Sequence, residues 1–367
     1  GPDGAIYVSD WFDAGVGGHR MSDRTGSGSI YRIAPRGFKP QIPAIDLSKV
    51  KGQIAALKSP AVHVRAVAFK ELKKNAGKAS SEIIHLSKDG SNWFAARATW
   101  LLPWCGKPGL QRLTELAEHG TASMRVVVLR SLRRAAAEQT PGNGIVATYH
   151  EVLKCACHDQ SSAVRREAAI ALRDVPLEQC CQELVSLANG FDGWDRWYLE
   201  ALGTACEGKE EGAYELLVGK SANDGRGWDR RLAGIAWRLH PASAVEALKA
   251  RAIGPNRTLE ERKQMVDALA FIHDAEAAKA MFTISLDGPK DIQPLAAWWG
   301  NHRLANDWSD LGFKGKFPKP PKLEAKTQTR LETRFLPAGQ PLFQARGDHA
   351  EIDIDVRGVQ RLYLVVD

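Results

Sequence analysis

A helical pattern that repeats roughly every 33 residues is the feature that most constrains how this chain can fold. An arginine recurs near the start of one predicted helix in each repeat, and successive copies are 32, 28, 40, 31 and 34 residues apart. The arginines in this series, called the arginine ladder below, are Arg65, Arg97, Arg125, Arg165, Arg196 and Arg230. A repeat of this length with two helices is typical of a helical solenoid, because each helix pair buries its apolar face only by stacking on its neighbours.

Apolar residues follow the same helical spacing from Asp46 to about Leu311. They recur three or four positions apart, which places them on one face of each helix. We therefore expect six to seven helix pairs, stacked in order along the chain. The residues predicted to be buried in them are Val64, Val67, Leu72, Val164, Ala168, Leu172, Leu202 and Ile235.

Short motifs within the repeats are similar to a known repeat family. The run 58–68 resembles a HEAT repeat, in which a short turn leads to a Val-Arg pair at the start of the second helix, and the run 159–169 does so too. Gly-Trp-Asp-Arg occurs twice, at 193–196 and 227–230. The resemblance implies a mainly α fold, a HEAT-type α-solenoid (an ARM-like superhelix), flanked by short β segments.

The two ends of the chain read as β structure. Runs 5–9 and 29–33 are rich in β-prone residues, and Ile352, Ile354 and Val356 alternate with charged residues as in a half-buried strand. Pro/Lys-rich residues 313–326 predict a stiff linker. The predicted segments are an incomplete propeller-like end at 1–36, a linker at 37–45, the solenoid at 46–312, the Pro/Lys linker at 313–326, and the start of a β-sandwich at 327–367.

The order of these parts resembles one multidomain family. Residues 3–11 and 28–33 look like the closing blade of a soluble glucose/sorbosone-dehydrogenase-type β-propeller. Residues 191–203 look like the HEAT portion of planctomycete-type "membrane-bound dehydrogenase" proteins, which carry C-terminal haem-binding domains. Residues 352–367 look like the first strands of a carbohydrate-binding module of the NPCBM type.

This resemblance implies an internal segment of an exported, periplasmic protein linked to sugar oxidation and electron transfer. Haem c, a quinone or calcium is then expected elsewhere in the longer protein, which would be a quinone- or haem-linked sugar dehydrogenase. No cofactor is expected in this segment, since it contains no Cys-x-x-Cys-His motif. The expected partners are other domains of the same polypeptide or another protein, with carbohydrate binding through the C-terminal module.

The composition leaves a second function open. The formal net charge is +7, from 50 basic and 43 acidic residues, and this permits an anionic partner without establishing one. A basic HEAT-repeat protein that binds nucleic acid or another anionic partner is therefore the alternative to a non-catalytic scaffold. The flanking β segments favour the scaffold, because a nucleic-acid-binding HEAT protein does not need them. No apolar run is long enough to predict a transmembrane helix.

Candidate binding residues come from a basic cluster and from a group of tryptophans. Each has two interpretations: the basic cluster is a solvated helix face or an anion site, and the tryptophans are core residues or an exposed platform. The ladder arginines either bind phosphate or hold neighbouring repeats together. The binding candidates are Arg125, Arg130, Arg133, Arg134, Trp194, Trp197 and Trp228.

Metal and catalytic chemistry has little support in the sequence. Cys155, Cys157 and His158 form a motif one residue short of c-type haem attachment, so we expect buried structural cysteines there, with a disulfide or a metal site as the alternatives. Asp10 and Asp13 lie in a Gly-rich run and are weak calcium candidates, with turn formation as the alternative. No arrangement of residues typical of a catalytic site is recognisable, so no enzyme activity is assigned to this segment.

Overall fold

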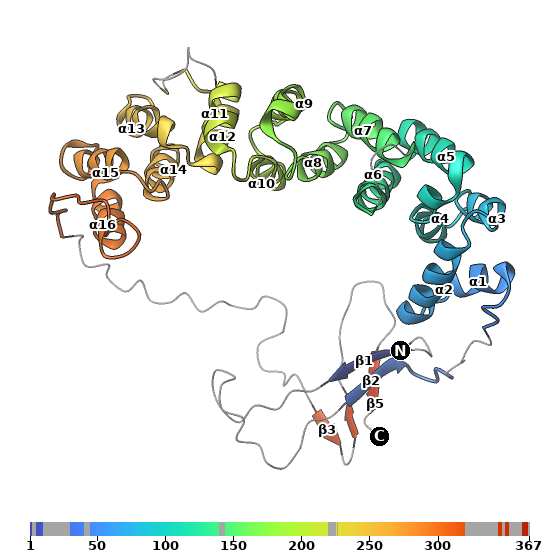
Figure 1. Ribbon diagram of the computed structural model, residues 1–367. Coiled ribbons are helices and arrows are strands. Elements are labelled where there is room, and N and C mark those ends of the chain that lie inside the picture. The colour runs from blue at the N-terminus through green and yellow to red at the C-terminus, as the bar shows by residue number, and fades with distance from the viewer. Residues whose placement is uncertain are drawn as a thin grey trace. The chain divides into compact units, whose positions relative to one another are not determined.

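The structure is a computed structural model in which most of the chain is helical. It describes residues 1, 5–9, 30–39, 45–138, 144–218, 225, 227–319, 344–346, 349–351 and 362–365. Sixteen α-helices lie within these residues, together with short β-strands (Figure 1). The chain divides into two compact units, 1–106 with 326–367 and then 107–325. This division falls inside the segment 46–312 that was predicted as one domain.

The β-strands belong to the first unit. Strands β1 (Ile6–Ser9) and β2 (Ile30–Pro35) pair antiparallel, with Ile6 opposite Ile33, which confirms the two strands predicted near the start of the chain. Strand β5 (Leu362–Val365) pairs antiparallel with the other edge of β2. Strands β3 (Gln344–Arg346) and β4 (His349–Glu351) form a separate pair. The strand predicted over Ile352, Ile354 and Val356 lies outside the described residues.

The first four helices also belong to the first unit. Helix α1 packs against α2, α3 packs against α4, and α1 also contacts α3. A 3₁₀ turn, η1 (Leu102–Trp104), follows and contacts both α3 and α4. The helices are α1 (Val50–Leu57), α2 (Val62–Lys74), α3 (Ser80–Leu86) and α4 (Asn92–Thr99).

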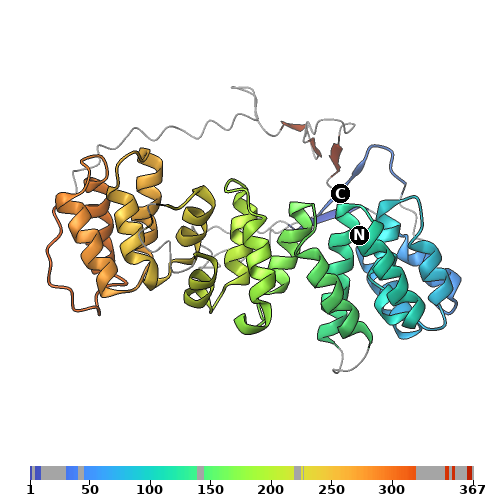
Figure 2. The same ribbon diagram turned by 90° about the horizontal axis from the view of Figure 1, so that it is seen from above.

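The second unit consists of twelve further α-helices arranged in two rows. The even-numbered helices follow one another on the inner side of a curve, and the odd-numbered helices lie on its outer side (Figure 1). Each even-numbered helix from α6 to α14 contacts the next even-numbered one. From above, the helix pairs follow each other along the row (Figure 2). The helices are α5 (Gly106–His119), α6 (Ala122–Ala137), α7 (Gly144–Ala156), α8 (Ser162–Ala171), α9 (Leu177–Asn189), α10 (Arg196–Ala205), α11 (Glu210–Val218), α12 (Arg230–Leu239), α13 (Val245–Ile253), α14 (Leu259–Ala270), α15 (Ala275–Asp287) and α16 (Gln293–Leu304).

Most of the predicted core residues are buried between these helices. The confirmed residues are Leu72, Val164, Ala168, Leu172, Leu202 and Ile235, each at most 2% exposed. The prediction was wrong for Val67, which is 47% exposed, and Val64 is only half-buried. Helix α2 buries Ala68 and Leu72 instead. Because successive helical residues are about 100° apart, Val67 points well away from the face that contains its neighbour Ala68.

The number of helix pairs exceeds the prediction. The sixteen helices make eight consecutive pairs, against the six to seven expected. All six ladder arginines lie on even-numbered helices, from α2 to α12. Arg262 on α14 comes 32 residues after Arg230 and extends the series, but no Val-Arg or Trp-Asp-Arg motif marks it in the sequence. The last helix, α16, has no arginine in its first turns, and the spacing argument could not find it.

Candidate functional site

The ladder arginines bind backbone and side-chain acceptors, mostly in a neighbouring repeat. Arg97 donates from Nη1 to the carbonyl oxygen of Leu57 at 3.1 Å. Arg125 makes two bonds to Asp159, Nε to Oδ2 and Nη2 to Oδ1, both at 2.7 Å. Burial opposes ionisation of Asp159, but hydrogen bonds from Arg125 and from the Ser161 amide outweigh it and hold the pKa of that carboxyl below its ordinary value. These arginines therefore position one repeat against another.

The later ladder arginines make the same kind of contact. Arg165 Nη2 donates to the carbonyl of Gly190 at 2.9 Å, and Arg230 Nε donates to the carbonyl of Gly193 at 3.0 Å. Two arginines differ. Arg65 donates to carbonyls of its own preceding turn, and Arg196 pairs with Glu200 on its own helix at 2.5 Å. The Arg196 guanidinium thus has a side-chain partner on its own helix.

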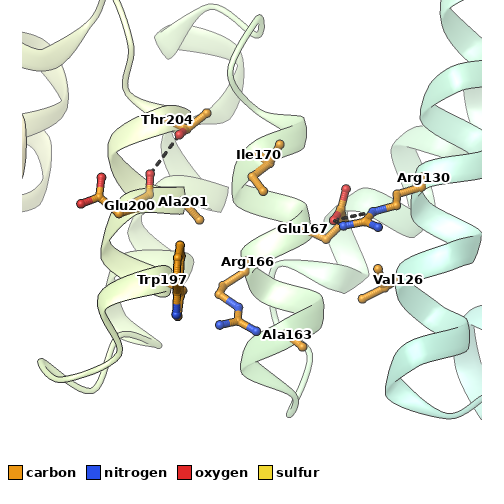
Figure 3. Close-up of a pocket in the computed structure, with 10 residues that line it drawn as sticks. All are labelled: Val126, Arg130, Ala163, Arg166, Glu167, Ile170, Trp197, Glu200, Ala201 and Thr204. Atoms are coloured by element: carbon orange, nitrogen blue, oxygen red, sulfur yellow. Dashed lines mark hydrogen bonds and ion pairs between the residues drawn. The ribbon is translucent and has the colours of Figure 1, made fainter. Parts of the chain in front are cut away.

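A groove of about 550 Å³ crosses the inner row from α6 through α8 to α10. Its apolar part includes Val126, Ala163 and Ile170, and Trp197 projects into it from α10 with 75% of its surface exposed. Arg166 and Ile170 on α8 point into the same space as Trp197 (Figure 3). The size lies within the range of ligand pockets, which is roughly 300–1,000 Å³.

Ion pairs link the helices on either side of this groove. Arg130 on α6 pairs with Glu167 on α8 at 2.7 Å, and Arg166 on α8 pairs with Asp195 before α10 at 3.4 Å. Glu200 on α10 receives a second arginine, Arg238 of α12, at 2.6 Å. Burial opposes ionisation of Glu200, but its two arginines outweigh it and lower the pKa. One arginine from each of four successive even-numbered helices forms what we call the arginine strip: Arg130, Arg166, Arg196 and Arg238.

The predicted basic cluster on α6 is divided among different contacts. Arg125 is held by Asp159, and Arg130 borders the groove. Arg133 lies 3.8 Å from Asp174, and Arg134 lies 3.5 Å from Glu138. Of the four residues in the cluster, only Arg130 lines the groove.

The three candidate tryptophans have different surroundings. Trp194 is 70% exposed, and the Arg230 guanidinium lies 3.2 Å from the centre of its ring. Trp197 is the groove residue. Trp228 is only 3% exposed and packs edge-on against Tyr214, so its prediction as a binding residue was wrong. Trp194 and Trp228 lie in the same tetrapeptide, Gly-Trp-Asp-Arg. In both copies the aspartate, Asp195 or Asp229, caps the helix that follows, but the tetrapeptide does not determine whether the tryptophan is buried.

A chain of aromatic rings runs along the inner row beyond the groove. Trp237 on α12 contacts His240, which contacts Phe271 after α14, which in turn contacts Trp299 on α16. Trp298 and Trp299 lie 4.7 Å apart at 71°, and Trp298 stacks on His302. Arg196 of the arginine strip lies 4.4 Å from the Trp237 ring, so the strip and the aromatic chain are continuous.

The side chains of Cys155, Cys157 and His158 do not form a metal site. Cys155 is exposed, whereas Cys157 is buried, and burial raises the pKa of the Cys157 thiol to about 12. The His158 ring contacts the Ser186 hydroxyl at 2.8 Å. Across the described residues, no three His, Cys, Asp or Glu side chains are placed to hold a metal ion. Asp10 and Asp13 fall outside the described part of the chain.

Several groove residues were not predicted from the sequence. Arg166, Glu167 and Glu200 were missed. A usable signal existed for two of them, because Arg166 directly follows a ladder arginine and Glu200 lies four residues after another, on the same helix face. The burial of Glu167 between two helices has no such signal.

Comparison with known proteins does not identify the chain. No protein-family model matches it, and no curated protein matches it either. Among the described helices, none combines the length and apolar character needed to cross a lipid bilayer.

Proposed function

We propose that this chain is the HEAT-type α-solenoid of a longer exported protein, where it acts as a non-catalytic scaffold and interaction segment. The observation that carries the proposal is the set of arginine contacts between successive repeats. Arg97, Arg165 and Arg230 each donate to a backbone carbonyl of a neighbouring repeat. Arg125 reaches the next repeat through the Asp159 carboxylate. Such nearest-neighbour contacts are what a solenoid requires, since each repeat is stabilised mainly by the next.

The resemblance of the chain's parts to the dehydrogenase-like multidomain family supplies the wider context. In this proposal the helices hold a sugar-oxidising propeller domain apart from haem-binding and carbohydrate-binding domains of an exported protein. The groove on α6, α8 and α10 supports an interaction role, because it combines an exposed tryptophan with arginines and an apolar floor. Tryptophan and arginine are enriched among residues that dominate binding energy at interfaces.

The full polypeptide that contains the chain provides the test. Its reading frame should encode a β-propeller before Gly1 and a Cys-x-x-Cys-His motif after Asp367. The purified protein should reduce its haem when glucose is added. Replacing residues 46–312 by a flexible linker should slow haem reduction and leave glucose oxidation with a soluble dye unchanged. A reading frame that lacks both neighbouring domains would contradict the proposal.

The alternative, an anionic partner, is favoured by one specific observation. Helices α6, α8, α10 and α12 of the inner row carry an excess of arginine over acidic residues. Nucleic acid binding would show as a steep fall in affinity with rising salt, because each neutralised phosphate releases counterions. An affinity for single-stranded DNA that survives at physiological salt would replace the scaffold as the primary function.

A further inference from the structure

The two rows of helices in the second unit have opposite charge. Helices α6, α8, α10 and α12 contain ten arginines, no lysine and two glutamates, a formal charge of +8, or +6 when the two capping aspartates are included. Helices α5, α7, α9 and α11 contain three basic and eight acidic residues, a formal charge of −5. The basic side chains thus gather on the inner row, where the groove lies.

We infer that the groove and the arginine strip form a docking surface for an acidic, partly apolar segment of a protein. This inference rests on the proposed interaction role and names the chemistry of the partner. Charge complementarity is the first argument. Guanidinium groups bind carboxylates through two parallel hydrogen bonds, which suits a strip built from arginine rather than lysine.

The ion pairs of the strip leave it able to accept a new carboxylate. Arg130 is 54% exposed and Arg196 is 61% exposed, although each is paired with a glutamate. Glu200 alone serves both Arg196 and Arg238, so one carboxylate is shared by two cations. The Arg196–Glu200 pair is partly exposed on both sides, and exposed ion pairs contribute about 0–1 kcal/mol, so a carboxylate from a partner can exchange with this pair at little cost. Glu167 is only 8% exposed, so at Arg130 a new carboxylate binds the exposed part of the guanidinium and leaves Glu167 in place.

The apolar part of the groove favours a peptide over a nucleic acid. Val126 and Ile170 offer aliphatic surface beside the exposed Trp197 ring, which suits the side chain of a leucine or phenylalanine. Glu167 and Glu200 also line the groove, and a phosphate backbone lying across it has a charge at every nucleotide, so it cannot keep its charges away from these carboxylates. A peptide can instead place apolar side chains over the floor and carboxylates at the arginines.

Fluorescence anisotropy of the whole chain tests the inference. The probe is a short fluorescein-labelled peptide in which aspartate and glutamate flank a Leu-Phe pair. A second peptide replaces the acidic residues by lysine, and a third probe is a labelled oligothymidylate. The acidic peptide should bind, and the Trp197→Ala and Arg130→Gln variants should weaken binding roughly tenfold and about threefold, as expected for contacts that dominate an interface and for those at its edge.

Two matched variants serve as controls. Trp93→Ala removes a tryptophan that is 76% exposed, on α4, against 75% for Trp197. Arg173→Gln removes an arginine that is 50% exposed and paired with Glu207 at 2.8 Å, outside the groove. Both should keep the wild-type affinity. A thermal melt of each variant shows that it is folded.

Four results would overturn the inference: equal binding of the lysine peptide, equal losses in the control variants, no binding of the acidic peptide, or tighter binding of oligothymidylate that Arg130→Gln abolishes. The last result would assign the surface to nucleic acid. If the peptide fails while the reading frame and the haem-reduction assay behave as proposed, only this inference falls. If that assay fails while the peptide binds as expected, the docking surface stands and the scaffold proposal falls.

Discussion

Leu172 lies at the end of α8 in the middle of the inner row and is 2% exposed. Replacing it by alanine should lower the free energy of unfolding by roughly 2–5 kcal/mol, because the transfer energy is lost and a cavity is left behind. Val67→Ala is the matched control, since this side chain is 47% exposed and should lose less than about 1 kcal/mol. Urea denaturation measures both. Similar losses in the two variants would mean that the row is not closely packed around Leu172.

His240 links the stability of the inner row to pH. Burial, together with the nearby Arg238 charge, lowers its pKa from 6.5 to about 4, and Glu200 partly opposes this change. Since the folded state binds the proton more weakly than the unfolded state, the stabilisation from neutral His240 is complete above pH 6.5 and is lost as the pH falls toward 4.

The variant His240→Asn should remove part of this acid sensitivity. Asparagine is a suitable replacement because residue 240 has a φ of 50°, in the left-handed region that asparagine tolerates. Between neutral pH and pH 4, the wild type should lose about 1–3 kcal/mol more unfolding free energy than the variant. Denaturation curves across this pH range provide the measurement. Parallel pH profiles for the two proteins would exclude His240 as the titrating group.

At the scale of single elements, α10 depends on one residue for two contacts. Asp195 caps the helix by accepting from the Tyr198 amide, and it also pairs with Arg166 across the groove. Asp195→Ala should cost about 1 kcal/mol, because the cap is lost, whereas Asp195→Asn keeps the cap and should cost less than about 0.5 kcal/mol. Thermal unfolding of both variants distinguishes the two roles. Equal losses for asparagine and alanine would show that the ion pair dominates.

Helices were predicted well where a pattern within their own sequence determines them. Helical spacing located the helices around Val164 and Ile235, and the arginine ladder located every even-numbered helix up to α12. The signal failed where the result depends on the neighbouring helix. Trp194 and Trp228 share a tetrapeptide yet differ in exposure from 70% to 3%, because burial depends on what packs above each ring.

The candidate site was less predictable than the helices, for the same reason. Trp197 and Arg130 were identified by residue type, but their partners Arg166, Glu167 and Glu200 come from three-dimensional proximity of α6, α8 and α10. The sequence separations of the ion pairs, 37 for Arg130–Glu167 and 29 for Arg166–Asp195, differ by several residues. A strict period therefore does not locate them.

At the scale of the second unit, stacking of each helix pair on its neighbours predicts that a destabilising substitution lowers amide protection only in nearby helices. In a solenoid, stability is approximately a sum of repeat and interface contributions. The Leu172→Ala variant should therefore lose amide protection mainly in α7, α8, α9 and α10, and little in α15 and α16. Hydrogen exchange with mass spectrometry resolves these regions. A uniform loss across all helices from α5 to α16 would mean that the unit unfolds as one globular body and would contradict the solenoid proposal.

The contact between Trp298 and Trp299 also has an optical consequence. Their rings are 4.7 Å apart and inclined at 71°, so the electronic transitions of the two indoles couple with a defined handedness. Coupled chromophores in a fixed chiral arrangement give a pair of circular dichroism bands of opposite sign, and this signal vanishes when either ring rotates freely. Because the pair contacts Phe271 and His302, it forms a label-free spectroscopic reporter at the α14–α16 end of the inner row.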